Sequence, residues 1–208
     1  HAREADVETN RACWALGPDG AAALFRRRDP QYFEIHWSDP EETGQTSVAL
    51  EPGVPKRLDP HVTRIIAPNP GMMTGPGTNT YLVGEQDLAV IDPGPAIDSH
   101  VAAVLAAAAG RIRLVLCTHT HLDHSPAAAA ITAATGAVLL GRPAPGQPGQ
   151  DHGFAPDRVL EHGDRVMIGG LTLRAIHTPG HASNHLCYFL ENTRMLFTGD
   201  HVMQGSTV

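Results

Sequence analysis

The segment Thr118-His119-Thr120-His121-Leu122-Asp123-His124 is the stretch that decides how this chain is interpreted. It places three imidazoles and one carboxylate within six positions, directly after the apolar run 112–117. Imidazole nitrogens and carboxylate oxygens are the ligands that Zn²⁺ takes in hydrolytic sites. The segment therefore predicts a metal site in a loop at the end of a buried strand.

This loop divides into two pairs of candidate ligands. His119 and His121 lie two residues apart just beyond the strand, so their side chains can point the same way and share one ion. Asp123 and His124 follow and are expected to face a neighbouring position. One loop can thus serve two ions about 3.5–4 Å apart, which is the separation found in two-metal hydrolases.

A third imidazole for the first ion is expected from the segment His177-Thr178-Pro179-Gly180-His181. His177 and His185 each stand four residues from His181, and strand–turn geometry does not allow all three to face one ion. His181, which follows the Pro-Gly turn, is the predicted ligand.

A second carboxylate comes from Asp200 in the segment Phe197-Thr198-Gly199-Asp200, which again begins at the end of a predicted strand. Asp200 is placed to bridge both ions. A water held between them would have its pKa lowered toward neutrality, and the resulting hydroxide would serve as the nucleophile. Asp123 is the candidate to orient that hydroxide or to relay a proton.

Composition limits the class of protein. The chain has 208 residues, 42% hydrophobic and 18% charged, as expected of a globular protein, and no apolar run approaches the roughly 20 residues of a membrane helix. The formal net charge of −7 disfavours non-specific binding to a nucleic-acid backbone. Three scattered cysteines are too few for a disulfide framework, so a reduced, cytoplasmic setting is expected.

The chain is expected to contain two parts. Residues 1–60 form an N-terminal extension of unknown role, with a short helix over 19–28, a strand over 31–37 and a linker over 38–60. Residues 61–208 contain a β-α-β-α-β passage up to residue 140, in which Asp98 is the expected helix N-cap, and an antiparallel meander after residue 156. An α/β layered fold follows. His100, His152 and His162, which have no nearby partners in sequence, are expected at the surface.

The order of the motifs resembles the metallo-β-lactamase superfamily of dinuclear hydrolases. The resemblance covers about residue 63 to the end and implies an αββα sandwich, incomplete at the C-terminus and preceded by the extension. It implies two Zn²⁺ ions, although iron or manganese fits the same donors. The ligands that it implies are His119, His121 and His181 on one ion, Asp123 and His124 on the other, and Asp200 between them.

Upstream, Asn69-Pro70-Gly71 and residues 77–84 resemble the beta-lactamase-like protein 2 branch, some members of which cut single-stranded RNA. His124 and Asp200 also match the glyoxalase II-like pattern. In the beta-lactamase-like protein 2 branch the Gly-Thr-Asn-Thr loop lies near the metal cleft, so Asn79 either contacts substrate or is simply a turn residue.

The superfamily pattern includes one more histidine well after the bridging aspartate, and the sequence ends at Val208. We expect that ligand from later residues or from a second chain in a homo-oligomer. The leading hypothesis is a zinc-dependent hydrolase whose metal-bound hydroxide attacks an ester, thioester or phosphodiester. The substrate is then a small-molecule thioester or ester, or RNA. A non-catalytic metal-binding or interaction protein on the same scaffold is the alternative from another class.

Overall fold

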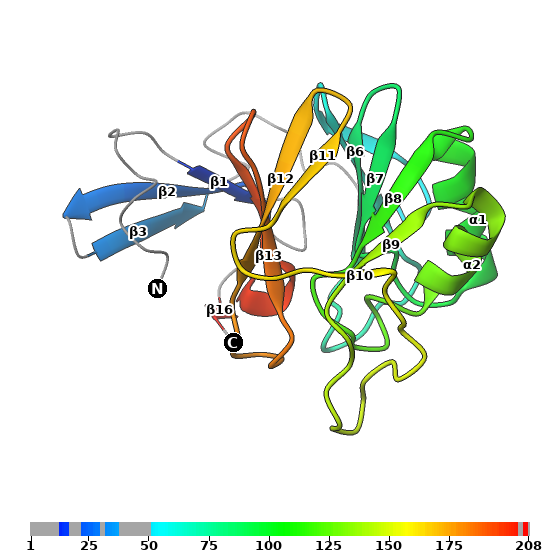
Figure 1. Cartoon of the computed structure of the whole chain (residues 1–208). Coiled ribbons are helices and arrows are strands. Elements are labelled where there is room, and N and C mark those ends of the chain that lie inside the picture. The colour runs from blue at the N-terminus through cyan, green and yellow to red at the C-terminus, as the bar shows by residue number, and fades with distance from the viewer. Residues whose placement is uncertain (1–12, 17–21, 30–31, 38–50, 204–205, 208) are drawn as a thin grey trace.

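Two seven-stranded sheets form the framework of the molecule. The computed structural model describes residues 13–16, 22–29, 32–37, 51–203 and 206–207. Figure 1 shows the two sheets packed face to face, with helices α1 and α2 on the outer side of one of them. A two-stranded ribbon, β15 (Val202–Met203) with β16 (Ser206–Thr207), follows at the C-terminal end.

The first sheet has the strand order β10-β9-β8-β7-β6-β5-β4. Its strands β7, β8 and β9 are parallel and are connected through the two helices, whereas β4 to β7 are antiparallel neighbours. Most of the strands expected here are confirmed to within two residues. The bounds are β4 Lys56–Asp59, β5 Val62–Ile66, β6 Asn79–Gly84, β7 Leu88–Ile91, β8 Ile112–Leu116, β9 Val138–Gly141 and β10 Arg158–Val159.

The two helices pack on this sheet through small apolar faces. Helix α1 (Asp98–Ala108) buries Val104 and Ala108, and α2 (Ala127–Thr135) buries Ile131. The expected N-cap of α1 is wrong by one residue: Ile97 is the cap and makes no side-chain cap bond. Its carbonyl already accepts the first helical hydrogen bonds, from the backbone N–H groups of residues 100 and 101. Helix α2 ends at Gly136 in the left-handed conformation, as expected.

The second sheet contains the predicted meander. Strands β11 (Arg165–Ile168), β12 (Leu171–His177), β13 (Leu186–Leu190) and β14 (Met195–Phe197) pair antiparallel in sequence order. Strand β1 (Cys13–Leu16) then adds parallel to β14, and β2 (Ala22–Asp29) and β3 (Tyr32–Trp37) extend the sheet. Strands β1 to β3 thus belong to the same sheet as β14, the strand that ends shortly before Asp200.

The helix predicted over residues 19–28 is wrong, because Ala22–Asp29 forms strand β2. This strand pairs antiparallel on both sides, with Phe25 opposite Cys13 and Ile35. Pairing with two neighbours overrides the helical tendency of an Ala-Leu-Arg segment. The strand predicted over 31–37 is confirmed as β3. Of the linker predicted over 38–60, residues 38–50 lie outside the described residues. The linker prediction is wrong for Lys56–Asp59, which forms strand β4 by pairing with β5. The division of the chain at residue 60 stays a prediction.

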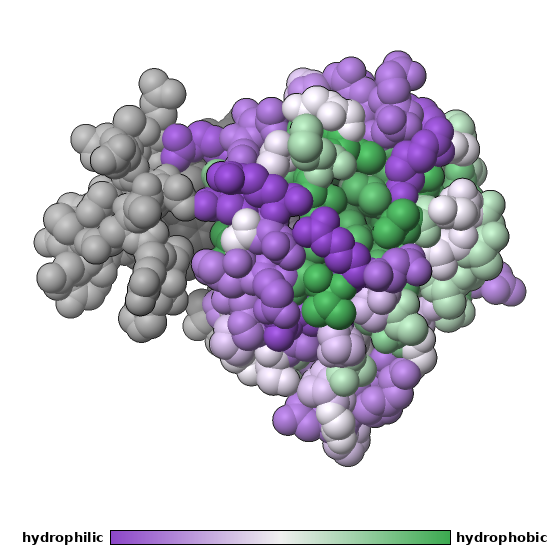
Figure 2. Space-filling model, viewed as in Figure 1, coloured by the Kyte–Doolittle hydropathy of each residue, from purple (hydrophilic) through white to green (hydrophobic). Residues whose placement is uncertain are grey.

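Buried apolar residues form one layer between the sheets and another beneath the helices. Strand β8 contributes to both, because Leu116 faces the opposite sheet while Val115 and Cys117 face the helices. A strand covered on both faces explains the almost entirely apolar run before the metal loop. In Figure 2 hydrophobic residues are visible between the two sheets, framed by hydrophilic ones. Among the described residues no helix combines the length and apolar character needed to cross a membrane.

Candidate metal centre

The loop after β8 is fixed by a buried carboxylate from the neighbouring strand. Asp92 directly follows β7, is 3% exposed and has a positive φ of 51°. The Thr118 backbone N–H donates to Asp92 Oδ1 at 2.7 Å, and the Thr118 hydroxyl donates to Oδ2 at 2.8 Å. Thr118 Oγ1 in turn lies 3.0 Å from His119 Nδ1. Asp92 therefore fixes the start of the loop and, through Thr118, contacts the first imidazole.

Three imidazoles converge at one point. His121 Nδ1 lies 3.0 Å from His119 Nε2 and 2.9 Å from His181 Nε2. A single ring nitrogen has either one hydrogen or one lone pair, so it cannot satisfy both neighbours by hydrogen bonding. Nitrogens on a tetrahedral Zn²⁺ at 2.0–2.1 Å are separated by roughly 3.3 Å. The arrangement of His119, His121 and His181 therefore fits a metal ion better than a hydrogen-bond network.

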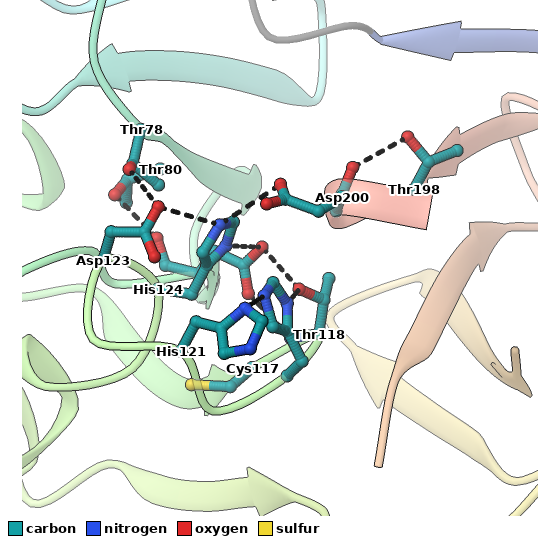
Figure 3. Close-up of polar contacts among 12 residues, drawn as sticks. Thr78, Thr80, Cys117, Thr118, His121, Asp123, His124, Thr198 and Asp200 are labelled. Atoms are coloured by element: carbon teal, nitrogen blue, oxygen red, sulfur yellow. Dashed lines mark hydrogen bonds and ion pairs between the residues drawn. The ribbon is translucent and has the colours of Figure 1, made fainter. Parts of the chain in front are cut away.

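A second group adjoins the first and includes His124 and Asp200, with His119 shared between the groups. His124 is 5% exposed, and its Nε2 lies 3.4 Å from Asp123 Oδ2 and 3.3 Å from Asp200 Oδ1. Its Nδ1 lies 3.0 Å from Asp92 Oδ2. Figure 3 shows the carboxylates of Asp123 and Asp200 on either side of the His124 ring. The expected pair of Asp123 and His124 does lie together. Asp123 is nevertheless outside the second group of converging ligand atoms, which consists of His119, His124 and Asp200.

Asp200 faces both groups. Its Oδ1 lies near His124 Nε2, and its Oδ2 lies 3.5 Å from His181 Nε2. The residue belongs to a short 3₁₀ turn, Gly199–His201, that directly follows β14. Gly199 has a φ of 48°, and a Cβ there would lie 2.6 Å from Thr118 Oγ1. Glycine at this position therefore allows the segment of Asp200 to approach the metal loop closely.

The acidic groups shift the protonation of their neighbours. Burial alone would lower the pKa of His124, but the negative charge of Asp92 and the bonds to Asp123 and Asp200 raise it well above its ordinary value. Burial opposes the ionisation of Asp123, yet the bond to His124, the charge of His124 and the bond to Thr78 lower its pKa to about 2. The pKa of Asp200 is also lowered, because His124 outweighs burial. The site therefore favours positive charge at the centre of its carboxylates.

Two imidazoles of the first group, those of His119 and His121, are kept neutral by lowered pKa values. Burial lowers the pKa of His119 well below its ordinary value, and the charges of His124 and His185 add to this. Burial and His181 similarly lower the pKa of His121. A neutral imidazole has the free lone pair that a metal ion needs, so both residues are prepared to act as ligands near neutral pH.

Sequence reasoning missed residues that support the loop. No local sequence pattern indicates a role for Asp92, because that role depends on the parallel pairing of β7 with β8. His100, expected at the surface, is fully buried, with Nε2 2.9 Å from Thr80 Oγ1. Its place on the sheet-facing side of α1 explains this, because neighbours from β6 cover it. His152 and His162 are exposed, as expected.

Thr78, which precedes the predicted substrate contact Asn79, is the residue of this loop that contacts the candidate metal centre. Asn79 is 8% exposed at the start of β6. Its neighbour Thr78 donates a hydrogen bond to Asp123 Oδ2 at 3.2 Å, and Asn69 Oδ1 accepts the Thr78 backbone N–H at 2.9 Å. Figure 3 shows Thr78 directed at Asp123. The loop between β5 and β6 thus borders the candidate metal centre.

Residues 73–208, about two thirds of the chain, match the profile of the Metallo-beta-lactamase superfamily. The chain belongs to the metallo-beta-lactamase superfamily. Two curated members similar to it are an atrochrysone carboxyl ACP thioesterase from Aspergillus chevalieri, 36% identical, and a lactamase-like protein, vrtG, from Penicillium aethiopicum, 36% identical. These alignments cover 89% and 82% of the chain but only 59% and 54% of the relatives. The chain thus spans somewhat more than half of their length.

Solved structures of superfamily members confirm the fold. The BLEG-1 B3 metallo-beta-lactamase aligns with a TM-score of 0.57 and 21% identity, over 70% of this chain and 75% of its own. BJP-1, a subclass B3 metallo-beta-lactamase of Bradyrhizobium japonicum, gives a TM-score of 0.52 and 24% identity, over 65% and 56%. The predicted metallo-β-lactamase-like fold class is confirmed on this ground.

Proposed function

We propose that this chain carries the two-metal site of a hydrolase that cleaves acyl thioesters. The observation that carries the proposal is the position of Asp200, whose two carboxylate oxygens face His124 and His181. One carboxylate between two sets of imidazoles is the arrangement that two-metal hydrolases use. The names of similar relatives, atrochrysone carboxyl ACP thioesterase and thioesterase pkgB of Emericella nidulans, support the thioester as the bond that is cleaved.

The donor set fits two zinc ions, since it consists of imidazole nitrogens and carboxylate oxygens. We assign the first ion to His119, His121 and His181, the second to Asp123 and His124, and the bridging position to Asp200. When bound, the ions lower the pKa of a coordinated water and polarise the carbonyl of the substrate. With a pKa of about 2, Asp123 stays ionised at neutral pH, so it is suited to orienting the reacting water rather than to accepting its proton.

Surface properties favour an apolar acyl thioester over RNA. Leu122, between two of the assigned ligands, is 57% exposed, and Met72 on the neighbouring loop between β5 and β6 is 99% exposed. Exposed apolar side chains beside a site suit an apolar acyl group. The net charge of −7 repels a polyanion. The finer resemblance to the beta-lactamase-like protein 2 and glyoxalase II branch stays a prediction. Of the two activities that it suggests, RNA cleavage and thioester hydrolysis, we favour thioester hydrolysis.

The proposal is tested with the natural full-length protein loaded with zinc. Thiol release from acyl thioesters of increasing acyl length is measured in parallel with cleavage of a single-stranded RNA. We expect thiol release, and we expect His121→Ala to abolish it. The matched control His152→Ala replaces an exposed histidine outside the site and should retain the wild-type rate.

Two outcomes would contradict the proposal. RNA cleavage without thiol release would assign the site to phosphodiester hydrolysis. Stoichiometric metal binding with neither activity would favour the alternative of a metal-binding protein without turnover.

A further inference from the structure

His185 lies against the candidate metal centre without belonging to either group of converging ligand atoms. It directly precedes β13 and is fully buried. Its ring is stacked on the ring of His119, with 5.0 Å between centroids and 27° between planes. Aromatic rings at this separation interact favourably and restrict each other's rotation.

The plane of the His185 ring is fixed from the segment that carries His181. His185 Nδ1 lies 3.0 Å from the hydroxyl oxygen of Thr178. The Thr178 backbone N–H also donates to the His185 carbonyl at 3.0 Å, so the two residues are joined twice. His185 therefore connects the segment of His181 with the ring of His119.

Among the described residues, the other ring nitrogen lies outside both groups of converging ligand atoms and outside the hydrogen bonds. Nε2 of His185 is buried and has no hydrogen-bond partner within the part of the chain that the structure describes. It faces Gly199, where an added Cβ would lie only 2.8 Å away. An unpaired buried nitrogen destabilises a fold, so the fold alone gains nothing from this nitrogen. What the ring does provide is a flat surface against His119.

We propose that His185 is a positioning residue, whose stacked ring holds His119 in the orientation in which Nε2 of His119 points at His121 and His181. The inference rests on the proposed function, because it presumes that these three histidines hold a metal ion. Residues that orient a metal ligand change metal affinity about 10–100-fold when they are removed. His185 would act in this way through ring contact.

The test compares His185→Ala, which removes the ring, with His185→Phe, which keeps a flat ring but cannot coordinate a metal. Zinc affinity is measured on the full-length protein by competition with a chromophoric chelator, and stoichiometry by elemental analysis. We expect His185→Ala to lower zinc affinity at least about tenfold. We expect His185→Phe to restore most of it and both variants to keep the wild-type stoichiometry. His177→Ala serves as the control, because His177 lies on the same segment and its Nε2 lies 3.0 Å from the Ser183 carbonyl rather than in the ligand groups.

The outcomes separate the possible roles. If both variants lose the same zinc affinity and each also binds one zinc ion fewer per chain, then His185 is a ligand and the proposal is overturned. Unchanged affinity in His185→Ala would also overturn it. Thermal unfolding of the metal-free variants identifies any that fail to fold, and the absorption spectrum of the Co²⁺-loaded protein then reports the geometry around His119 directly. If the wild-type protein binds no metal, the proposed function fails first, and this result is distinct from either of the others.

Discussion

At the scale of single residues, the ligands and their supports differ in how they can be recognised. His119, His121, Asp123 and His124 lie within one short segment, so spacing alone revealed them. Asp92 contacts Thr118 and His124 only because β7 and β8 are parallel neighbours. Its position in the sequence is 26 residues before Thr118, and no local pattern connects the two. Supports of this kind depend on the pairing of strands and are found only in the folded structure.

Replacing Asp92 with asparagine tests this support. Asp92→Asn keeps the shape but removes the charge that faces His124 and one acceptor oxygen. We expect metal affinity and kcat/KM to fall about 10–100-fold, because the orientation of both His124 and the loop is weakened. Zinc competition and steady-state kinetics measure the two effects.

The control for this change is Asp98→Asn, which removes an equal charge from an exposed position in the first turn of α1. It should leave both quantities unchanged. An Asp92→Asn variant indistinguishable from this control would show that the carboxylate does not support the site.

At the scale of elements, the spacing of apolar and turn residues predicted most strands and loops correctly. The prediction failed where strand pairing opposed the local helix propensity of a segment. The meander after residue 156 followed from short apolar segments separated by turns, and its antiparallel pairing is confirmed. Strand β2 was misread as a helix because its alanines and arginines favour helix locally, while its hydrogen bonds come from β1 and β3. Long-range pairing is not encoded in the segment itself.

The 3₁₀ turn that carries Asp200 offers a test at this scale. Gly199→Ala introduces a Cβ that would lie 2.6 Å from Thr118 Oγ1 and 2.8 Å from His185 Nε2. We expect a loss of about 1–2 kcal/mol for the left-handed backbone, and in addition the loss of one or both metal ions, because the turn must move away from the loop. Thermal unfolding and elemental analysis measure the two components.

Gly169→Ala is the matched control, since Gly169 also has a positive φ, of 56°, but nothing lies within 4 Å of the added Cβ. It should show the loss of stability without the loss of metal. Equal metal content in both variants would contradict the close approach described for Gly199.

At the scale of the whole molecule, the candidate site joins segments that are distant in sequence. The assigned ligands come from the loop after β8, the segment before β13 and the turn after β14. A metal ion held by all three therefore links the two sheets. The sequence motifs predicted this assembly through family resemblance, but the extension of the second sheet by β1 to β3 was not predicted, because it rests on a parallel pairing with β14.

Metal removal should accordingly lower the stability of the whole protein. Zinc at 100 times its dissociation constant is expected to add about 2.7 kcal/mol to the free energy of unfolding, since only the folded chain brings the ligands together. Chemical denaturation before and after chelation measures the difference. In His181→Ala the added stability should largely disappear. Identical denaturation curves for the wild-type protein with and without zinc would contradict a site that links the sheets.

The pairing of Trp14 with Met195 also has a consequence for the order of events during synthesis. All residues up to Met195 must leave the ribosome before β1 can meet β14, and contacts between such distant residues form slowly. Until then β1 presents an open edge on which another chain can pair. Asp200 emerges immediately after β14. A nascent chain that stops short of it would have the histidine loop and the first sheet, but not the carboxylate that we assign to the bridging position.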